Sequence, residues 1–472
     1  MLPELGVGIV YTPGLDSLLD AGRDLIDVVE VEPQVFWFRA PALDGPFYRL
    51  NTAAFERFVR LPQRKIIHGV GFPVAGSCAL ETDQMEAFLE SIERLQAVWA
   101  SEHLSFNRVG GAAGFYAGFL LPPRQTLEGA ALAASNIRRL KTILPVPFAF
   151  ETGTNYLRPA SDELSDGAFI AAVSEMADCG ILLDLHNLWC NERNGRQPLR
   201  HALAEIPLER VWEVHVAGGR EMRGYWLDAH SGLVPEELMA VAAEVVPKLP
   251  NLKAVIFEII EEYIEEQNIR TSDLLKQMIR LHELWSMRGM AAEQRRQNCD
   301  RQIAQPDAKR VKELAEWEFA LACLVNDRSA RDLSIDGLKD DPGIAIYRDS
   351  IKSVRGGMVV TALQLTTRLL RLSLGEETFE KLMMAFWSTV PPEPFTSDEA
   401  ANFIAFLTQQ ELNVSYLDDV LRFEVARNRS YSELRQQPVS FHYDPIPLLQ
   451  SLGAGRLPEA VPEGNFDLVI GV

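Results

Sequence analysis

Apolar residues in the first 260 positions gather in eight short runs that are rich in β-branched and aromatic side chains, a pattern typical of buried strands. The runs are LGVGIVY (5–11), LIDVVEVE (25–32), RKIIHGV (64–70), HLSFN (103–107), PFAFE (147–151), ILLDL (181–185), VWEVHVAG (211–218) and AVIFEII (254–260). Between most of them, apolar residues recur every three or four positions, which predicts helices over 83–100, 126–144, 162–180, 235–249 and 272–285. Eight strands that alternate with helices predict an α/β fold, a (β/α)8 TIM barrel over residues 1–290.

A doubly wound parallel sheet is the competing interpretation of the same alternation. Sheets of that type that bind dinucleotides carry a G-x-G-x-x-G loop directly after the first strand. The corresponding stretch here, GVGIVYTPG (6–14), does not have the glycines in that order. The barrel is therefore the favoured fold.

The pattern changes beyond the barrel. Residues 291–304 are polar and poor in apolar side chains, as expected of a linker. Residues 305–435 contain amphipathic stretches separated by Gly and Pro, which predict a smaller, all-helical domain. The tail, 436–472, contains many prolines and glycines and is expected to be mostly irregular.

Composition narrows the function classes. The chain has 47% hydrophobic and 24% charged residues and a formal net charge of −20, which opposes nucleic-acid binding because a duplex needs a basic surface. The five cysteines (Cys78, Cys179, Cys190, Cys299 and Cys323) form no CxxC pair, so we expect a reducing compartment rather than a disulfide framework. The N-terminus does not resemble a signal peptide, and no apolar run reaches the ~18 residues of a membrane span. We therefore expect a cytoplasmic protein without a membrane partner.

Ligand-type side chains occur where predicted strands end. His68, Glu151, Asp184, His215 and Glu258 end five strands, and His103 lies at a sixth. One such histidine is usually a hydrogen-bonded core residue. Six consecutive strands are different, because the C-terminal ends of barrel strands converge on one mouth, where burying so many carboxylates without a counter-charge would be very costly. A cluster of cations is the simplest remedy.

The donor types limit the choice of metal. Histidine nitrogen mixed with carboxylate oxygen, without an obvious thiolate, suits iron, manganese or zinc. With Asn187 near the sixth strand and Asp228 and His230 after the seventh, the ligand-type residues exceed the four of one tetrahedral zinc. Two or three ions that share bridging carboxylates would use them all. His186, between Asp184 and Asn187, is expected to face the substrate or support the ligands.

Seven motifs in order carry a family resemblance over residues 5–290. They are HGVGFPVAGS (68–77), SEHLSF (101–106), ETGTNY (151–156), ILLDLHNLWCN (181–191), VWEVHVAGG (211–219), LDAH (227–230) and FEII (257–260). The series resembles the multinuclear non-heme iron-dependent oxidases, TIM-barrel enzymes that modify ribosomally made peptides. The resemblance implies two or three iron ions in the Fe(II) or Fe(III) state, O2 as co-substrate and a precursor peptide as substrate, oxidised most often at cysteine.

Residue by residue, the resemblance implies nine metal ligands. They are His68, His103, Glu151, Asp184, Asn187, His215, Asp228, His230 and Glu258. Among them, His68, Asp184 and His215 are expected to be essential for catalysis.

The chain departs from the family pattern at two places. Members often have an acidic residue and Asn after the second strand, where this chain has Gln34 and Val35, and they commonly have Asn where His186 stands. We expect Gln34, Tyr156, His186 and Trp226 to contact the substrate. The modified residue could then differ from cysteine, with Asp or Asn near the peptide's C-terminus as alternatives.

The helical region carries a second resemblance. The stretch from IYRDSIKSV (346–354) through FWS (386–388), followed by YLDDVLRFEVARNR (416–429), is similar to the partner proteins that help such oxidases to recognise their precursor peptides. Fusion would make a separate partner protein unnecessary. The alternative is a helical bundle that only caps the barrel or mediates dimerisation.

Two other functions remain open. A metal-dependent barrel of the xylose-isomerase or endonuclease-IV type would use similar His, Asp and Glu ligands for isomerisation or hydrolysis. A non-catalytic binding module would keep the metal only to hold its shape.

Overall fold

The structure is a computed structural model that describes residues 2–39, 48–78, 82–111, 113–289, 307–328, 337–433 and 435–471. The chain divides into two compact units. The first comprises Met1–Val35, Glu56–Gly114 and Leu120–Tyr347, and the second comprises Phe36–Phe55, Phe115–Phe119 and Arg348–Val472. The expected linker, 291–304, lies outside the described residues.

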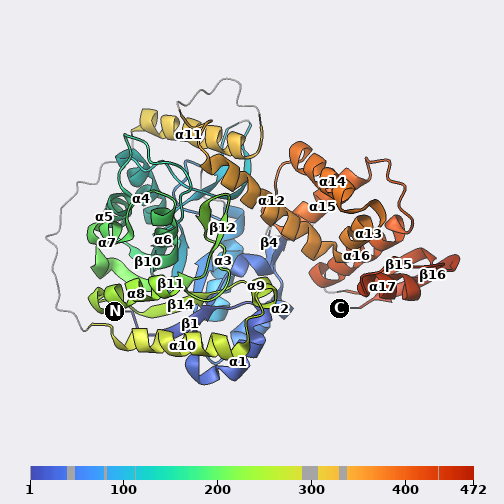
Figure 1. The fold of residues 1–472 in the computed structure, drawn as a ribbon, viewed down its shortest axis with the longest axis horizontal. Helices are drawn as coiled ribbons and strands as arrows, with labels where there is room; N and C mark the ends of the chain where they lie inside the picture. Colours follow the sequence, from blue (N-terminus) through green and yellow to red (C-terminus); the bar gives the residue numbers. More distant parts are fainter. Residues whose placement is uncertain are drawn as a thin grey trace. The chain divides into compact units, whose positions relative to one another are not determined.

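The first unit is a closed barrel of eight parallel strands in the order β1-β14-β11-β10-β9-β6-β5-β2. Figure 1 labels four neighbouring strands of this barrel, β10, β11, β14 and β1. The strands are β1 (Gly6–Val10), β2 (Val28–Val31), β5 (Arg64–Gly69), β6 (Ala100–His103), β9 (Phe148–Glu151), β10 (Gly180–Asp184), β11 (Val211–Ala217) and β14 (Ala254–Glu258). Every residue of β2, β9, β10 and β14 is buried, as expected for parallel strands covered on both faces. The predicted (β/α)8 fold is confirmed.

Helices follow the strands and surround the barrel. They are α1 (Asp16–Ala21), α2 (Thr52–Arg60), α3 (Thr82–Leu95), α4 (Leu127–Lys141), α5 (Asp166–Ala177), α6 (Leu185–Arg193), α7 (Leu199–Glu205), α8 (Glu236–Val245), α9 (Glu261–Glu266) and α10 (Thr271–Ser286). In α4, the side chain of Thr126 caps the N-terminus by accepting from the Gly129 N–H. Its buried face includes Ala130, Ile137 and Leu140, the helical spacing that the sequence displays.

The fourth barrel strand differs from its prediction. We expected it at 103–107, but β6 runs from Ala100 to His103, and 106–109 belong to β7 (Phe106–Val109), which is followed along the chain by β8 (Phe115–Leu121). Ser101 and Glu102 interrupt the apolar pattern, yet both are buried inside the barrel. Because β6 pairs with β5 and β9, the shift places His103 at the end of the strand rather than at its start.

Two segments do not follow the expected domain boundaries, because each belongs to the other compact unit. Helix α11 (Ala308–Val325) lies in the barrel unit. The β3–β4 hairpin (Trp37–Arg39 and Tyr48–Leu50), from within the expected barrel range, belongs to the second unit, where the ring of Tyr48 lies 4.5 Å from that of Phe395. An amphipathic pattern shows that an element has an apolar face but does not show which partner covers it.

Helix α11 is fixed to the barrel unit by a buried carboxylate. Glu318 accepts hydrogen bonds from the backbone N–H of Ser77 (3.0 Å to Oε2) and from its hydroxyl. Ser77 lies in the loop that follows β5, the strand that ends in His68 and Gly69. The side chain of Glu318 is almost fully buried. This contact joins a helix late in the chain to a loop at the mouth of the barrel.

The second unit is mainly helical. Its helices are α12 (Gly343–Ala362), which begins in the first unit, α13 (Gln364–Leu374), α14 (Glu376–Thr389), α15 (Thr396–Leu407) and α16 (Leu417–Glu433). They share a core that includes Leu369, Phe386, Phe403 and Val420, all fully buried.

The tail is not irregular, contrary to expectation. It forms β15 (Gln437–Tyr443), α17 (Pro445–Gly453) and β16 (Glu463–Ile470), and the two strands pair in antiparallel fashion. Val439 and Phe441 alternate on the buried face of β15. The Oδ2 atom of Asp419, on α16, accepts from the backbone N–H groups of His442 and Tyr443. The frequent Pro and Gly residues hid the period-two pattern of these strands in the sequence. The neighbouring helix α16 stabilises the paired strands.

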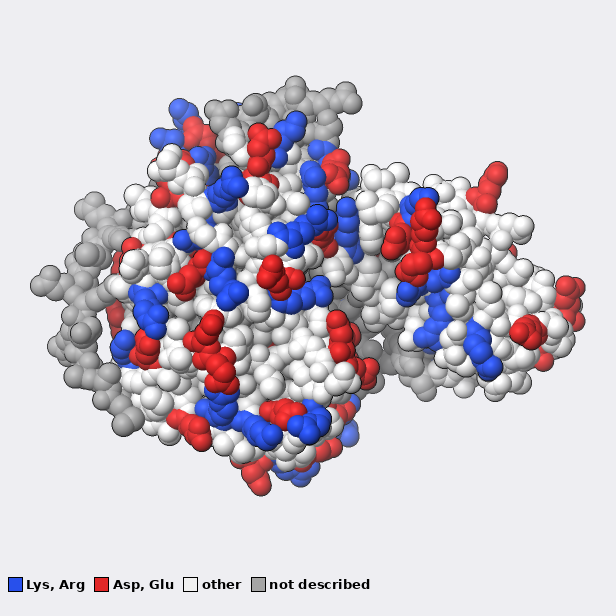
Figure 2. Space-filling model, in the orientation of Figure 1, with Lys and Arg blue, Asp and Glu red and all other residues white. Residues whose placement is uncertain are grey.

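Charged side chains of both signs are interspersed over the face of the barrel unit that Figure 2 shows. The acidic surplus of the sequence is thus not gathered in one patch on that face. Among the described residues, no helix combines the length and apolar character that crossing a membrane requires.

Burial makes the contact between Glu318 and Ser77 sensitive to pH. It raises the pKa of the Glu318 carboxyl from 4.5 to about 7, although both hydrogen bonds from Ser77 act to lower it. The folded protein therefore binds this proton more tightly than the unfolded chain, so the free energy of unfolding falls as the pH rises from about 4.5 to about 7. The free energy of unfolding of Glu318→Gln, relative to that of the wild type, should therefore increase between pH 5 and pH 8, by on the order of 3 kcal/mol at most.

Denaturant unfolding of the metal-free proteins at the two pH values measures this difference. Glu316→Gln, at an exposed position of the same helix, is the control and should show the same difference from the wild type at both pH values. A Glu318→Gln profile parallel to the wild type would contradict the prediction.

Candidate metal centre

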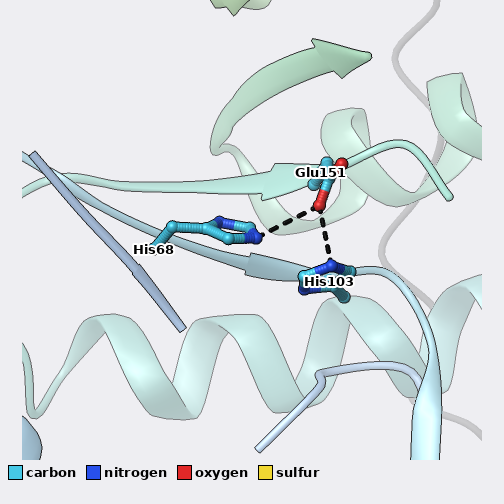
Figure 3. Close-up of side chains that lie close together, drawn as sticks. All are labelled: His68, His103 and Glu151. Carbon is cyan, nitrogen blue, oxygen red and sulfur yellow. Dashed lines mark ion pairs between the residues drawn. The ribbon is translucent and has the colours of Figure 1, made fainter. Parts of the chain in front are cut away.

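Three neighbouring strand ends bring two histidines and a glutamate together. His68 is the penultimate residue of β5, His103 is the last residue of β6 and Glu151 is the last residue of β9. The Oε2 atom of Glu151 lies 3.2 Å from Nε2 of His68 and 3.0 Å from Nε2 of His103 (Figure 3). His68 and Glu151 are buried, and His103 is partly so. The parallel register of β5, β6 and β9 places these side chains at one level of the barrel.

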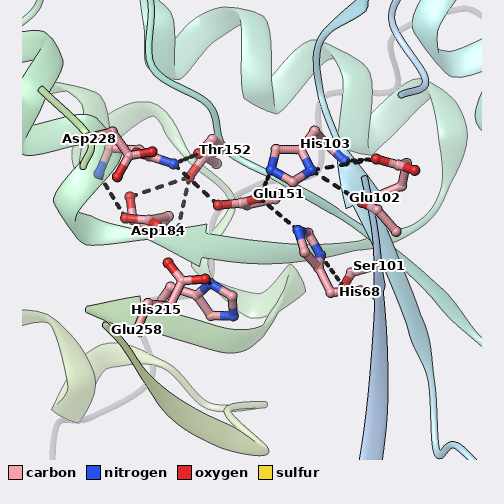
Figure 4. Close-up of polar contacts among 12 residues, drawn as sticks. His68, Ser101, Glu102, His103, Glu151, Thr152, Asp184, His215, Asp228 and Glu258 are labelled. Atoms are coloured by element: carbon pink, nitrogen blue, oxygen red, sulfur yellow. Dashed lines mark hydrogen bonds and ion pairs between the residues drawn. The ribbon is translucent and has the colours of Figure 1, made fainter. Parts of the chain in front are cut away.

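The opposite side of the mouth holds a second group of ligand-type residues. Glu258, at the end of β14, lies 3.2 Å from Nδ1 of His215 on β11 and 3.1 Å from Nε2 of His230. Asp228 Oδ1 lies 2.9 Å from the same nitrogen of His230. Figure 4 shows Asp184 and Asp228 near His215 and Glu258, across the mouth from His68 and His103.

His230 has a backbone conformation that few non-glycine residues adopt. Its φ is +45°, in the left-handed region. The backbone is held there because Ile260 N–H donates to the His230 carbonyl (2.9 Å) and Ser231 N–H donates to that of Gly218 (2.8 Å). Such a conformation costs about 1–3 kcal/mol and occurs often at functional sites. Here the left-handed backbone of His230 directs its imidazole toward Asp228 and Glu258.

Three overlapping sets of side chains in the mouth could each hold a metal ion, because their ligand atoms lie within 4.8 Å of one another. The sets are His68–His103–Glu151, Glu151–Asp184–His215 and Asp184–His230–Glu258. A fourth set that meets the same distance, Glu30–Glu213–His215, lies at the other nitrogen of the His215 ring. Neighbouring sets share Glu151 or Asp184. The structure therefore brings together seven of the nine expected ligands, and the other two, Asn187 and Asp228, contact members of these sets.

The junction between β10 and α6 presents two oxygen atoms to the mouth. Asp184 is the last residue of β10 and the N-cap of α6, and its Oδ1 accepts from the Asn187 N–H at 2.7 Å. The amide nitrogen of Asn187 donates to Glu151 Oε1 and to the Thr152 carbonyl, at 3.2 and 3.1 Å. This leaves Asp184 Oδ2 and Asn187 Oδ1, both buried, without a hydrogen-bond partner. A helix that starts without an intervening loop thus turns both residues toward the mouth.

The donor atoms of the mouth fit a cation. Five of the buried polar atoms without a hydrogen-bond partner belong to expected ligands: Glu151 Oε2, Asp184 Oδ2, Asn187 Oδ1, His215 Nδ1 and Glu258 Oε2. Leaving such an atom unsatisfied costs about 1–3 kcal/mol, and more for a charged group. Four oxygens and an imidazole nitrogen are the donors that borderline and hard metal ions accept. Metal ions would satisfy all five atoms at once.

The pKa values show how crowded the negative charge is. Burial, together with the charges of Glu151 and Asp228, raises the pKa of Asp184 well above its usual range. Burial opposes ionisation of Glu258 too, but His230 and His215 outweigh it and lower its pKa to about 2. For His103, burial lowers the pKa, yet Glu151 and Glu102 raise it to about 10. In the metal-free mouth, protonated histidines therefore supply the counter-charge that metal ions would replace.

His186 lies outside the three sets, as a supporting residue. The indole N–H of Trp226 donates to its Nε2 at 3.3 Å, and since an indole only donates, the ring proton must be on Nδ1. That nitrogen then donates to Asp228 Oδ1 at 3.2 Å. Tyr156 is buried beside them, and its hydroxyl accepts from the Asp228 N–H at 3.1 Å. Three of the four expected substrate-contacting residues thus surround Asp228, and their contact with a substrate remains a prediction.

Gln34 lies in the short 3-10 helix after β2 (Pro33–Phe36). Its side chain is buried, and neither polar atom has a hydrogen-bond partner among the described residues. A buried amide without partners is costly, so it suits a position where a ligand supplies them. Its role in substrate binding stays a prediction.

Four glutamates near the mouth, three of them buried and Glu32 partly buried, were not among the residues that the sequence predicted for the site. Glu102 contacts His103 Nδ1 (3.4 Å), and Glu30 and Glu213 lie around His215 Nε2 (2.8 and 3.7 Å). The charge of Glu32 interacts with His68 and Glu258. Their signal was period two, because Glu30 alternates with Glu32, and Glu213 with His215, so each pair shares a strand face. A criterion limited to strand ends does not detect them.

The comparisons with known proteins concern the barrel half of the chain. A family model described as RiPP precursor modification enzyme MbnB/TglH/ChrH matches residues 8–276. A UPF0276 protein of Streptomyces avermitilis is 30% identical over 254 residues, which cover 52% of this chain and 49% of that protein. A UPF0276 protein of Caulobacter vibrioides is 28% identical over 237 residues, covering 50% and 80%. The chain spans about half the length of the Streptomyces relative.

Solved structures give weaker matches. An L-ribulose 3-epimerase has a TM-score of 0.36 and 16% identity and covers 60% of this chain and 96% of its own. A D-allulose 3-epimerase from Methylomonas sp. has a TM-score of 0.39 and 11% identity, with coverages of 60% and 98%. The barrel assignment rests on the strand pairing described above.

The two roles of Asp184 can be separated by substitution. Asn caps helices about as well as Asp, so Asp184→Asn should unfold at or above the wild-type denaturant midpoint in the metal-free state, because it also removes a buried carboxyl group whose ionisation burial and Glu151 oppose. Asp184→Ala should lose about 1 kcal/mol with the cap. Both variants should bind less metal. Elemental analysis and denaturant unfolding measure the two effects, and full metal content in Asp184→Asn would show that Oδ2 is not a ligand.

Proposed function

The chain belongs to the family of RiPP precursor modification enzymes MbnB/TglH/ChrH, and from this premise we propose that it oxidises a residue of a ribosomally synthesised precursor peptide with dioxygen, at two or three iron ions in the barrel mouth. The family model covers more than half of the chain, and its membership agrees with the resemblance that the barrel motifs carry. The peptide-modifying class follows from the family. The oxidation, the iron and the modified residue are the proposal.

One observation carries the proposal: the three metal-ligand sets overlap through Glu151 and Asp184. Carboxylates have two oxygen atoms and can bridge neighbouring ions, whereas a single tetrahedral site needs only four ligands. Overlapping sets therefore favour a multinuclear centre over one isolated ion. Mixed histidine and carboxylate donors, with no thiolate in any set, suit iron.

In this proposal the nine expected residues hold the ions, in three parts of the mouth. The ligands are His68, His103, Glu151, Asp184, Asn187, His215, Asp228, His230 and Glu258. Bound iron would supply open coordination positions for the substrate atom and for O2, and the electrons that the oxidation needs. Removing Glu151 or Asp184, which neighbouring sets share, should affect more than one ion.

The residues of the chain prepare this chemistry in three ways. The Thr152 carbonyl and Glu151 hold the amide nitrogen of Asn187, so that its oxygen faces the ions. Trp226 fixes the tautomer of His186, which in turn orients Asp228. The buried strands of the barrel wall would limit the access of water to bound ions from the sides, which reduces side reactions.

Recognition of the peptide side chain is proposed for Gln34, Tyr156, His186 and Trp226. Gln34 has two buried polar atoms without partners among the described residues, and Trp226 is only partly buried. Because Gln34 and His186 depart from the usual family residues, we propose cysteine or a residue of the peptide's C-terminal region, such as Asp or Asn, as the target. An amide at position 34 could pair with either a carboxyl or an amide group.

The second unit is proposed to bind the precursor peptide. It has a hydrophobic core of its own, built from α12 to α17, so it does not consist merely of helices that cover barrel strands. The partner-like pattern lies in α12 to α14 and in α16. A fused recognition unit would raise the local concentration of the peptide and would make a separate partner protein unnecessary.

Metal and oxygen measurements test the proposed chemistry. The purified protein should contain two to three iron ions per chain and consume O2 only when the precursor peptide is added. His215→Ala should lose at least one ion and at least about a hundredfold in activity. The substitution removes a ligand of the set that contains both Glu151 and Asp184, the residues that neighbouring sets share. His201→Ala, at an exposed position on α7, is the matched control and should retain both.

Tightly bound zinc without oxygen uptake would contradict the proposal and favour a metal-dependent isomerase or hydrolase. Peptide binding that survives complete removal of the metal, with no turnover under any condition, would instead indicate a non-catalytic module.

Hydrogen exchange of the whole chain tests the recognition role. A precursor peptide encoded beside this gene should slow amide exchange in α12 to α16, because bound backbone and side chains shield those amides. Exchange in α8 and α10, on the outside of the barrel, is the internal control and should not change. Protection confined to the barrel would refute the recognition role of the second unit while leaving the proposed chemistry in place.

A further inference from the structure

We propose that Glu30 is a positioning residue that fixes two metal-facing histidines at once, His68 and His215. The inference rests on the proposed metal centre and adds a residue that is not among its ligands. Glu30 lies on β2, whose end contributes none of the nine ligands, and its side chain is fully buried.

The contacts of Glu30 reach the far side of both rings. Its Oε2 lies 2.8 Å from Nε2 of His215, and its Oε1 lies 3.7 Å from Nδ1 of His68. The other nitrogen of each ring faces the mouth, His215 Nδ1 toward Glu258 (3.2 Å) and His68 Nε2 toward Glu151 (3.2 Å). One carboxylate thus stands behind two imidazoles that point in different directions.

The topology of the barrel explains how one residue reaches both histidines. Strand β2 pairs with β5, which carries His68, and Glu30 is in register with Ile66. Strand β11, which carries His215, is separated from β2 by β1 and β14 in the closed sheet. Glu30 therefore reaches its neighbour along the wall and His215 through the interior of the barrel. Only an inward-pointing side chain of a central layer can make both contacts.

These contacts fix the proton positions on His215. A carboxylate only accepts hydrogen bonds, so Glu30 requires the ring proton to be on Nε2. When a metal ion replaces the proton on Nδ1, the lone pair of that nitrogen would then be available to the ion in the mouth, as a ligand requires. A carboxylate behind an imidazole also increases the basicity of the ligating nitrogen.

His68 is held by a hydrogen bond with Ser101 and by the charge of Glu30, whose Oε1 is too far from His68 Nδ1 for a hydrogen bond. Ser101 Oγ lies 2.8 Å from His68 Nδ1, and its own hydroxyl donates to the Ile67 carbonyl at 3.4 Å. Ser101 can therefore accept the Nδ1 proton of His68, which leaves Nε2 free to face the mouth. Glu30 adds the negative charge behind this pair that Ser101 lacks.

Glu213 supports the contact with His215 but does not extend to His68. Its Oε1 lies 3.7 Å from His215 Nε2, and its Oε2 accepts the indole N–H of Trp99 at 2.9 Å. Because an indole can only donate, this bond keeps Glu213 oriented. Among the carboxylates that lie within 4 Å of these rings in the described residues, only Glu30 is close to the far nitrogens of both histidines.

Two histidines from different ligand sets depend on Glu30 in this arrangement. His68 belongs to the set with His103, and His215 belongs to the set with Asp184. Loss of the Glu30 charge should therefore loosen metal at two positions. Supporting residues of this kind typically change metal affinity by about 10- to 100-fold.

Glu30→Gln and Ser101→Ala form the test pair. Glu30→Gln keeps the volume of the side chain but removes its charge behind both histidines, whereas Ser101→Ala removes a contact to His68 alone. The proteins are loaded with ⁵⁷Fe, and iron loss to EDTA is followed by elemental analysis and Mössbauer spectroscopy. In Glu30→Gln we expect about tenfold faster loss of iron and altered Mössbauer spectra at two iron positions. In Ser101→Ala we expect both changes at one iron position only.

Glu30→Asp is the rescue variant. It restores the charge on a side chain one methylene shorter, so iron retention should lie between that of Glu30→Gln and that of the wild type. It also keeps the test valid if Glu30→Gln does not fold, which circular dichroism of the metal-free proteins shows. Retention in Glu30→Asp no better than in a folded Glu30→Gln would overturn the proposed role of the charge.

The outcomes separate this inference from the proposed function. A wild-type protein that binds no iron refutes the metal centre itself. An iron-loaded wild type with Glu30→Gln unchanged overturns only the inference, as does a Glu30→Gln effect limited to the position that Ser101→Ala alters. Iron bound directly between Glu30, Glu213 and His215 would make Glu30 a ligand and would also overturn the positioning role.

Discussion

The mutual repulsion of carboxylates in the barrel mouth is the constraint on which the rest of the site depends. Glu151, Asp184 and Glu258 converge there, and Asp184 in particular cannot ionise easily beside Glu151. A fold that gathers so many acidic groups needs positive charge in the same place. Protonated histidines can supply it in the metal-free protein, and metal ions supply it with better geometry. The surrounding barrel strands are largely buried and closely packed, which keeps the walls rigid enough to hold these groups together.

Much of the barrel and its site could be predicted because both follow from local patterns. A strand end is visible in the sequence, and the convergence of strand ends is a property of the barrel, so His68, Glu151, Asp184 and His215 were found without any structure. The limits were also physical. Ser101 and Glu102 look like surface residues, and the strand that contains them was placed three residues too late. Polar residues inside a barrel are compensated by partners far away in the sequence, which a local pattern does not reveal.

The same limit explains the glutamates and the segments outside the barrel. Glu30 and Glu213 lie within strands rather than at their ends. Only the closed sheet shows that they contact the ligand histidines on the side away from the mouth. Helix α11 was recognised as amphipathic, but its attachment through Glu318 to Ser77 depends on a contact between residues 241 positions apart. The tail was judged by its prolines and glycines, although β15 and β16 pair with each other and α16 stabilises the ribbon. Association between distant segments is decided by complementarity rather than by composition.

The direct passage from β10 into α6 has a consequence for how this chain can change over evolutionary time. Asp184 is the last strand residue and Leu185 the first helical one, so no loop residue separates the two elements. An inserted or deleted residue at this point would rotate the first helical turn by about 100° and move Asn187 away from Glu151. Such a change would lose a cap and two oxygens in one step. Length variation should therefore accumulate at other βα connections, and this junction should diverge only by substitution.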